Sequence, residues 1–407
     1  MPKSPNMSVS VIQPGARLHY AVPALLQRAG MLRSFYTDLC ASIGPLRYIR
    51  YLWPTKLQPP SVRRMLGRQL PPDLPRGKVR HIAGHHLANC ARQKLRLSQR
   101  TTSSIPQLLE LARTQHCDGA DAVYTVMVND DLDFCREAKA RGCRIIHEVM
   151  LNPDIGIWLD EEHKLFPDVA REIPTLDEIQ QGRQLDREKY QISDLILVPS
   201  EFVYRSVVAL GADPSKVKLV PYGIDESWLE THPRPIPGRV LFVGAVGLLK
   251  GCHYLAEAKR LLAKRNIPCE VRIVGPAARG TDQHPLFSGP NYVGQVPRSD
   301  VRNEFLAADV FVLPSLCEGF ALAHLEALAC GIPVVTTPNC GSIVRDGVDG
   351  RIVPIRNSAA LASAISDIIT NRTLRAQMSK NARARARDYS WNRYGERLID
   401  AISELRP

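Results

Sequence analysis

Short, almost wholly apolar runs alternate with longer amphipathic stretches along most of this chain. This alternation restricts the fold more than any other feature, because such apolar runs are typical of strands buried on both faces. The amphipathic stretches between them are typical of helices that cover a sheet. The pattern therefore predicts an α/β fold with doubly wound parallel sheets. Strands are expected at 7–13, 120–128, 143–149, 194–199, 239–244, 269–274, 309–313 and 333–336. Helices are expected at 18–30, 130–142, 178–192, 201–210, 251–265, 299–307, 321–330, 358–370, 373–387 and 391–405.

Two such series are separated by residues 222–238, which hold Pro233, Pro235, Pro237 and Gly238. Proline at this density favours an extended linker over another helix or strand. A chain of 407 residues is also too long for one typical core. We therefore expect two domains, over residues 1–222 and 239–389.

The net charge of +12 is concentrated in one segment, residues 41–115, which holds fourteen basic and two acidic residues. Its eight prolines and weak periodicity predict an insertion on the first domain. We expect this segment to make peripheral contact with an anionic membrane or an anionic acceptor, with Tyr48, Tyr51, Leu52 and Trp53 dipping into the interface. The alternative is a solvated basic surface. Nucleic-acid binding is disfavoured because aromatic residues are few and no known module is present.

Several classes of protein are disfavoured by what the sequence lacks. No apolar run approaches the roughly 18 residues that a membrane-spanning helix needs. The first residues, MPKSPNMSVSVIQPG, contain no signal-peptide stretch, so a cytoplasmic protein is expected, with contact at the inner membrane face. The ten cysteines form no C-x-x-C pair, so reduced, mostly buried thiols are expected and no metal site is predicted.

The most informative stretch is DVFVLPSLCEGFALAHLEALACGIPVV, residues 309–335. It predicts a buried strand, a loop with Glu318 and Gly319, and a helix at 321–330. The N-terminus of a helix that follows a strand favours an anion such as a diphosphate. Glu318 precedes the helix and Glu326 lies more than a turn inside it, so one carboxylate could reach sugar hydroxyls and the other a ribose. From spacing alone, both could instead be solvated surface acids.

The residues from Glu318 to Val335 resemble the E-x7-E signature of glycosyltransferase family 4. The resemblance covers roughly residues 145–405. It implies the GT-B fold, in which two Rossmann-like domains face a central cleft, and a final helix, residues 390–407, that packs back on the first domain. Further matching blocks are SDLILVPSEFVYRSVVALGADPSKVKLVPYGID (193–225), RVLFVGAVGLLKG (239–251), VRIVGP (271–276), NYVGQVPRSDV (291–301), NCGSIVRDGVDGRIVP (339–354) and SWNRYGERL (390–398).

The resemblance also implies an activity, the retaining transfer of a hexosyl group from a UDP- or GDP-sugar without a metal. The nucleotide sugar is a co-substrate, and no other cofactor is implied. A glycan, a lipid-linked molecule or a small molecule would be the acceptor, as in polysaccharide biosynthesis. Two other readings stay open at this point: a non-catalytic GT-B-like subunit that binds a glycan or nucleotide, and a sugar-nucleotide epimerase.

Particular roles follow from the same resemblance. Glu318 is expected to bind the ring hydroxyls of the donor sugar, Glu326 the ribose, and Lys250 the diphosphate, whose charge grows as the glycosidic bond breaks. Donor contacts through the backbone are expected from Gly319, Phe320, Ala321, Leu322 and Gly244.

One position departs from the family pattern. Many relatives have Arg where this chain has Ala245, and that Arg is a second cation for the diphosphate. A replacement would have to come from elsewhere, such as Arg279 or Arg17.

The first domain offers weaker signals. Gly15, in a tight loop after the first expected strand, could bring a backbone amide to the phosphates. His147 ends the expected strand at 143–149 and is followed by Glu148, which resembles the family's His-acid step in the cleft. His147 would bind the donor's primary hydroxyl or orient the acceptor; otherwise it is a buried structural histidine. Asn152 and Asp154 follow and would shape the acceptor side.

Overall fold

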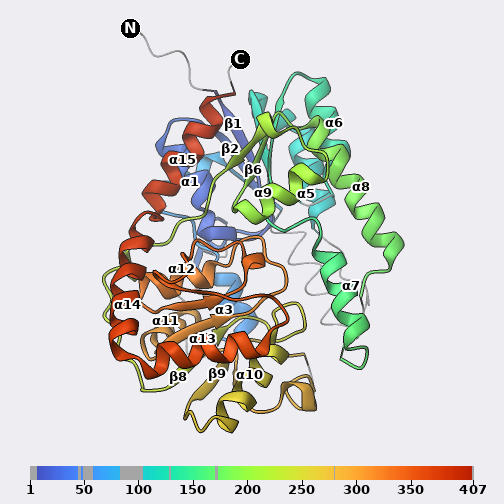
Figure 1. The fold of residues 1–407 in the computed structure, drawn as a ribbon. Coiled ribbons are helices and arrows are strands. Elements are labelled where there is room, and N and C mark those ends of the chain that lie inside the picture. The colour runs from blue at the N-terminus through green and yellow to red at the C-terminus, as the bar shows by residue number, and fades with distance from the viewer. Residues whose placement is uncertain are drawn as a thin grey trace.

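The computed structural model describes residues 7–44, 47–48, 58–82, 104–127, 130–169, 173–278 and 280–405. They form two α/β domains, one above the other in Figure 1, each built on a fully parallel sheet. Tyr51, Leu52, Trp53 and Arg279 lie outside the described residues.

The first sheet has the order β3-β2-β1-β4-β5-β6-β7, so the winding direction reverses between β1 and β4. Its strands are β1 (Val9–Ile12), β2 (Leu32–Thr37), β3 (Val79–His81), β4 (Ala122–Thr125), β5 (Arg144–Glu148), β6 (Leu195–Val198) and β7 (Val217–Leu219). Its helices are α1 (Ala21–Arg28), α3 (Pro60–Leu66), α5 (Ile105–Thr114), α6 (Leu132–Ala140), α7 (Ile155–Leu165), α8 (Leu176–Ile192) and α9 (Glu201–Ala209).

The second sheet repeats this plan with the order β10-β9-β8-β11-β12-β13, and its reversal lies between β8 and β11. The doubly wound α/β architecture predicted from the sequence is confirmed. The strands are β8 (Arg239–Val243), β9 (Glu270–Val274), β10 (Asn291–Gly294), β11 (Val310–Leu313), β12 (Val334–Thr336) and β13 (Gly350–Ile352). The helices are α10 (Cys252–Lys264), α11 (Arg298–Leu306), α12 (Leu322–Ala329), α13 (Ser358–Thr370), α14 (Arg372–Arg387) and α15 (Trp391–Ser403). Short 3-10 turns occur at Arg17–Tyr20, Arg76–Lys78, His116–Gly119, Pro214–Lys216, Glu226–Trp228, Pro285–Phe287 and Pro338–Cys340.

The expected helix at 18–30 is wrong at its start. Leu18, His19 and Tyr20 all have positive φ, between 47° and 62°, in the left-handed region. An α-helix cannot run through such residues, so α1 begins only at Ala21.

The last helix belongs to the core of the first domain. In Figure 1, α15 runs beside α1, and a Cβ on Gly395 would lie 2.6 Å from the Leu25 side chain. Tyr394 and Leu398 are fully buried in the cluster that surrounds β1. The chain thus passes between the domains twice. The two connecting segments are hydrogen-bonded to each other, because Ile224 N–H donates to the Tyr389 carbonyl (2.8 Å). The exact domain limits given above stay a prediction.

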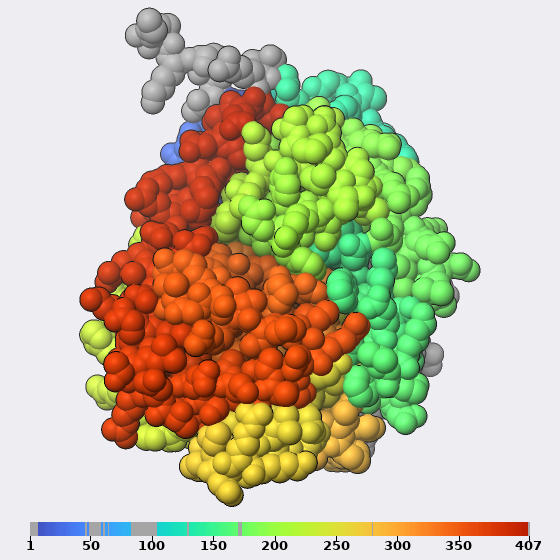
Figure 2. All heavy atoms as spheres, in the orientation of Figure 1, coloured from blue at the N-terminus to red at the C-terminus, as the bar shows by residue number. Residues whose placement is uncertain are grey.

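Helix α7 lies on the second domain although it belongs to the first, and Figures 1 and 2 show it along that domain's flank. Its Glu162 is fully buried. The Glu162 carboxylate accepts hydrogen bonds from Tyr254 Oη (2.6 Å) and Arg356 Nε (2.7 Å), and His253 Nε2 lies 2.8 Å away. Burial alone would raise the pKa of Glu162, but these three partners outweigh burial and lower it. A buried carboxylate therefore ties the two domains together.

None of the helices in the described parts of the chain has the length and apolar character to cross a bilayer.

Candidate functional site

The loops after β8 and β11 lie side by side, because these strands are neighbours at the point where the second sheet reverses. Ligands of doubly wound folds bind at this place, outside the carboxyl ends of the strands. Gly251, which precedes α10, has φ +67° and would place a Cβ 2.1 Å from the Pro314 carbonyl oxygen. Only glycine allows the two loops to approach so closely.

Lys250 and Glu318 form an ion pair in this pair of loops. Ser315 Oγ also donates to the Glu318 carboxylate (3.1 Å). Burial lowers the pKa of Lys250 below its usual value. The two residues expected to contact the sugar and the diphosphate are therefore brought together. A bound diphosphate would compete with Glu318 for the ammonium.

Glu326, on α12, lies in the wall of a cavity of about 780 Å³ between the domains. Its carboxylate accepts a hydrogen bond from Arg298 Nη2 (2.6 Å), and its side chain is 9% exposed against 63% for Arg298. Burial raises the pKa of Glu326, although Arg298 opposes this. Leu18 and His19 of the first domain line the opposite side of the cavity. Glu326 can therefore offer hydrogen-bond acceptors to a ligand held between the domains.

An aromatic and cationic surface extends this cavity. The Arg302 guanidinium lies 4.7 Å from the centre of the Trp228 ring, and Arg298 lies 6.0 Å from it. Cations over an indole face are attracted by the ring, and the two guanidinium groups make this part of the cavity wall positively charged. Sequence reasoning missed all three residues. The spacing of Arg298 and Arg302, four residues apart on one helix, was the available signal.

The loop of Gly319 and Phe320 packs against the first domain. A Cβ on Gly319 would lie 1.9 Å from the Met150 carbonyl oxygen, and the Gly319 carbonyl accepts a hydrogen bond from Ser200 Oγ (2.7 Å). The Phe320 ring meets the Tyr222 ring edge-on at 5.3 Å. The close approach expected of Gly319 is therefore made to the backbone of the other domain.

The backbone amides expected at the donor are partly engaged within the protein. Leu322 N–H donates to the Phe320 carbonyl (3.1 Å), and Gly244 N–H donates to the Val274 carbonyl (2.9 Å). Gly15, with φ +72°, donates its N–H to Asp38 Oδ1 (2.8 Å). Ala321, the residue before α12, is buried. The donor contacts of these residues stay predictions.

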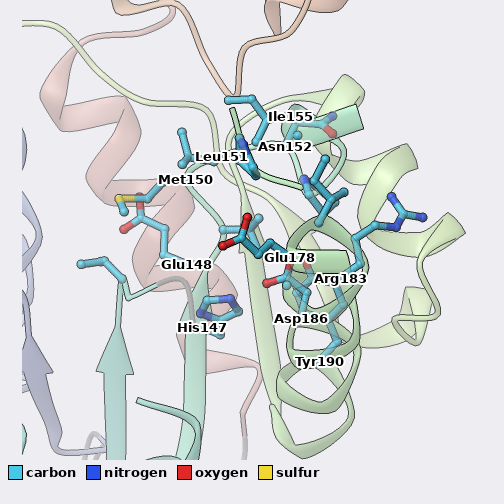
Figure 3. A pocket seen from close by; sticks show the side chains of 17 residues that line it. His147, Glu148, Met150, Leu151, Asn152, Ile155, Glu178, Arg183, Asp186 and Tyr190 are labelled. Atoms are coloured by element: carbon cyan, nitrogen blue, oxygen red, sulfur yellow. The ribbon is translucent and has the colours of Figure 1, made fainter. Parts of the chain in front are cut away.

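His147 and Glu148 point to opposite faces of β5, as neighbours on a strand must. His147 is buried against a smaller cavity inside the first domain, shown in Figure 3. Glu148 accepts hydrogen bonds from Tyr124 Oη (2.5 Å), Tyr222 Oη (2.6 Å) and Arg17 Nη2 (2.6 Å). Burial would raise the pKa of Glu148, but Arg17 and the hydroxyls hold it below its usual value. The Arg17 guanidinium is thus committed to Glu148.

Residues 234–385 match the family described as glycosyl transferases group 1. The second domain belongs to this family. The resemblance to glycosyltransferase family 4 that the sequence motifs carried is thereby confirmed.

Curated relatives of this group 1 domain support the same assignment. A D-inositol 3-phosphate glycosyltransferase of Xylanimonas cellulosilytica is 29% identical over 55% of this chain and 60% of its own length. That of Geodermatophilus obscurus is 34% identical over 47% of this chain and 48% of its own. The putative colanic acid biosynthesis glycosyltransferase WcaL of Salmonella typhimurium is 27% identical over 54% and 59%. The chain thus spans roughly half to three fifths of these relatives' length.

Solved structures extend the likeness to both domains. Anabaena HepE, in complex with UDP and glucose, superposes with a TM-score of 0.63 at 16% identity, covering 98% of this chain and all of its own. Sucrose-phosphate synthase of Thermosynechococcus elongatus gives 0.68 at 17%, covering 98% and 99%. These neighbours are GT-B glycosyltransferases, and the GT-B fold is confirmed.

Asn152 and Asp154, which were expected to shape the acceptor side, contact other residues of the first domain. Asn152 is fully buried, and its Nδ2 donates to Ser206 Oγ (2.8 Å). Asp154 forms an ion pair with Arg183. Ala245 is exposed after β8, where the resemblance to the family implies an Arg. With Arg17 held by Glu148, Arg298 is a described cation beside the cavity that could take that role.

Proposed function

We propose that this protein is a retaining glycosyltransferase that moves a hexosyl group from a UDP- or GDP-sugar to a hydroxyl-bearing acceptor without a metal. The observation that carries the proposal is the ion pair of Lys250 and Glu318 in the loops where the second sheet reverses, together with Glu326 in the wall of the cavity between the two doubly wound domains. Acceptor classes in keeping with the family are glycans, lipid-linked molecules and small molecules.

The donor would lie across the N-terminus of α12. Glu326 would bind the ribose hydroxyls, and Glu318 would leave Lys250 to bind the sugar hydroxyls. The Lys250 ammonium would then pair with the diphosphate, together with the amides of the first turn. The structure of HepE with UDP and glucose supports a donor of this chemical class.

In the transfer, the bond between the sugar's anomeric carbon and the diphosphate oxygen breaks, and the acceptor oxygen bonds to that carbon from the same face. The acceptor's proton passes to the departing diphosphate. Lys250 would lower the barrier by stabilising the charge that grows on this leaving group. His147 would position the acceptor or the sugar's primary hydroxyl.

The residue that supplies the second cation for the diphosphate must be another one, because Ala245 has no charge. We propose Arg298, which is 63% exposed at the cavity wall. When ribose hydroxyls occupy Glu326, the Arg298 guanidinium loses its partner and can turn to the phosphates.

Peripheral membrane contact by residues 41–115 stays a prediction, and it would suit a lipid-linked acceptor. Several cations of the described part already have partners: Arg68 with Asp38, Arg80 with Asp118, and Arg113 with Glu137. Co-sedimentation with anionic and neutral vesicles at about 50 and 500 mM salt tests the contact, since screening weakens charge attraction. Equal recovery in the supernatant with both vesicle types at low salt would rule it out.

The proposed activity is tested by mixing purified protein with UDP- and GDP-hexoses and following release of the nucleoside diphosphate. Thermal shifts identify which nucleotide binds, because a ligand of the native state raises its melting temperature. Glu318→Gln is expected to lower turnover with little loss of stability, while Glu304→Gln, which alters an acid outside the cavity, keeps turnover. If no nucleotide sugar binds or reacts, the proposal fails.

A further inference from the structure

A second cavity, of about 200 Å³, lies inside the first domain between the carboxyl end of β5, α7 and α8 (Figure 3). Its walls are mainly apolar, with Val149, Leu151, Ile155 and Ile179 among them. In Figure 3, Leu151 and Ile155 lie at one end, and His147 lies toward the other. Leu151 is 46% exposed and His147 only 3%, so the cavity opens at Leu151 and is closed at His147.

Two helical glycines line this cavity, Gly156 on α7 and Gly182 on α8. A Cβ on Gly182 would meet no atom of the described residues within 4 Å, and neither glycine has a positive φ. Glycine disfavours a helix, and here the backbone does not require it. A Cβ on Gly156 would lie 2.9 Å from Ile179 Cγ1, so that glycine lets the two helices approach. The missing side chain at Gly182 keeps the cavity open.

His147 gives the closed end a hydrogen-bond acceptor. Its ring is hydrogen-bonded to the Thr125 backbone, and burial, together with the charge of Lys189, lowers its pKa, so the ring is neutral. The Nδ1 atom is buried and has no hydrogen-bond partner among the described residues. A buried, unpaired acceptor is unfavourable unless a ligand donates to it. A hydroxyl group is a donor of the right size.

The closed end of the cavity also holds a carboxyl group. Asp186 lies there, and burial raises its pKa to about 6, although the positive charges of Lys189 and Arg183 oppose this. The charged side chains of Glu178, Arg183 and Asp186 all belong to the lining of the cavity. The cavity thus combines mainly apolar walls, a neutral acceptor at His147 and an apolar rim at Leu151. A neutral alcohol with an apolar body matches all three.

We propose that this cavity binds an apolar alcohol, whose hydroxyl donates to His147 Nδ1 and whose hydrocarbon part lies along Val149 and Ile155 toward Leu151. Met150 lies in the cavity wall, and its carbonyl abuts Gly319 of the donor loop. The cavity would then hold an apolar alcohol part of the acceptor, whose separate reacting hydroxyl lies outside the open end, where Gly319 approaches Leu151; this statement rests on the proposed glycosyltransferase function. Binding of the alcohol itself does not depend on that function.

Calorimetry with 1-octanol as the probe tests the proposal, with methyl α-glucoside as a polyol without an apolar chain. The native protein is expected to bind 1-octanol and not the glucoside. Gly182→Leu fills the cavity and is expected to weaken octanol binding at least ~10-fold, since the hydrocarbon loses its contact surface. Gln181→Leu places a leucine on the exposed side of α8, next to Gly182, and is the control for adding leucine to this helix, with unchanged binding.

Two further variants keep the test decisive if Gly182→Leu does not fold. Leu151→Asp places a charge at the open, exposed end and is expected to weaken octanol binding. His147→Phe keeps the ring and removes the acceptor, so it is expected to reduce the preference for 1-octanol over heptyl methyl ether, which has no hydroxyl donor. Octanol binding unchanged in Gly182→Leu or in Leu151→Asp, or binding of the glucoside alone, would overturn the proposal.

UDP binding, measured in the same proteins, separates this inference from the proposed function. The expected result is that Gly182→Leu loses octanol and keeps UDP. Native protein that binds octanol but no nucleotide refutes the glycosyltransferase proposal and leaves the alcohol site standing. Native protein that binds UDP but not octanol refutes the alcohol site and leaves the glycosyltransferase proposal standing.

Discussion

Glu162→Gln should loosen the contact between the two domains. In the native protein this carboxylate is fully buried and faces hydrogen-bond donors from Tyr254 and Arg356, with His253 Nε2 2.8 Å away. Glutamine has nearly the same shape, but one oxygen becomes an NH2 group that faces donors instead of accepting from them. The Arg356 guanidinium also loses the neutralising charge of Glu162.

The size of the effect follows from these contacts. Losing one hydrogen bond to a charged group costs about 1.5–3 kcal/mol of unfolding free energy. For a domain of 150–250 residues, 2 kcal/mol corresponds to about 4–8 °C in melting temperature. Glu162→Ala would cost more, about 3–5 kcal/mol, because the Arg356 charge stays behind without this partner. Glu161→Gln is the matched control: this neighbour is 49% exposed and 3.2 Å from Arg356. Such exposed pairs contribute only about 0–1 kcal/mol.

Scanning calorimetry and small-angle X-ray scattering would measure this. Glu162→Gln is expected to lower the first unfolding transition, to separate it from the second, and to increase the radius of gyration as the domains part. Since a two-domain chain need not unfold in one step, transition temperatures should be compared directly. A Glu162→Gln protein that melts and scatters like Glu161→Gln would show that the buried carboxylate does not hold the domains together.

Four further outcomes are expected. Lys250→Ala should slow transfer at least ~100-fold, by analogy with removing one transition-state hydrogen-bond donor. Lys264→Ala, at the exposed end of α10, is the control and should not slow transfer. Equal transfer rates in the two variants would mean that another cation holds the diphosphate. Glu326→Ala should weaken donor binding by about 1.5–3 kcal/mol in calorimetry, and unchanged affinity would exclude the ribose contact. Arg298→Ala should weaken binding of UDP more than of uridine; an equal loss for both would exclude a phosphate contact. His324 is fully buried, and burial together with Lys250 lowers its pKa from 6.5 to about 3. The unfolded chain therefore takes up a proton below pH 6.5 that the native state refuses, so about 2 kcal/mol of stability is lost between pH 6.5 and 5. Urea titrations should show a smaller loss in His324→Phe, and identical pH slopes would contradict this.

The sequence predicted β1, β4, β5, β6, β8, β9, β11 and β12, and it missed the strands β2, β3, β7, β10 and β13, each of which contains at least one polar residue. β2 contains Ser34, whose hydroxyl is buried against that of Ser10 at 2.7 Å. A buried serine pair satisfies itself across two strands, which no single-strand pattern reveals. Helix α7 was missed for a similar reason, because it packs on the second domain and not on its own sheet. The left-handed turn at Leu18 was missed as well, because three consecutive non-glycine residues rarely adopt positive φ.

The residues of the candidate site also fall into those that the sequence predicted and those that it missed. Glu318, Lys250 and Glu326 could be named from local motifs, and the structure places the first two in one ion pair. The partners of Glu162 are 91 to 194 residues away, so only the folded chain brings them together. Gly319 was expected to approach a ligand, yet its backbone meets Met150 of the other domain. A glycine motif signals close approach without saying to what.

The first domain is synthesised first but completed last. Domains generally fold as they leave the ribosome, yet Tyr394 and Leu398 of α15 fill the core beside Leu25. α15 is synthesised after the whole second domain. Until then, the apolar residues of α1 that pack against α15 are exposed to solvent. The nascent first domain therefore exposes an apolar groove until α15 is made, and chaperones bind such surfaces. If translation stalls before residue 391, the groove stays exposed.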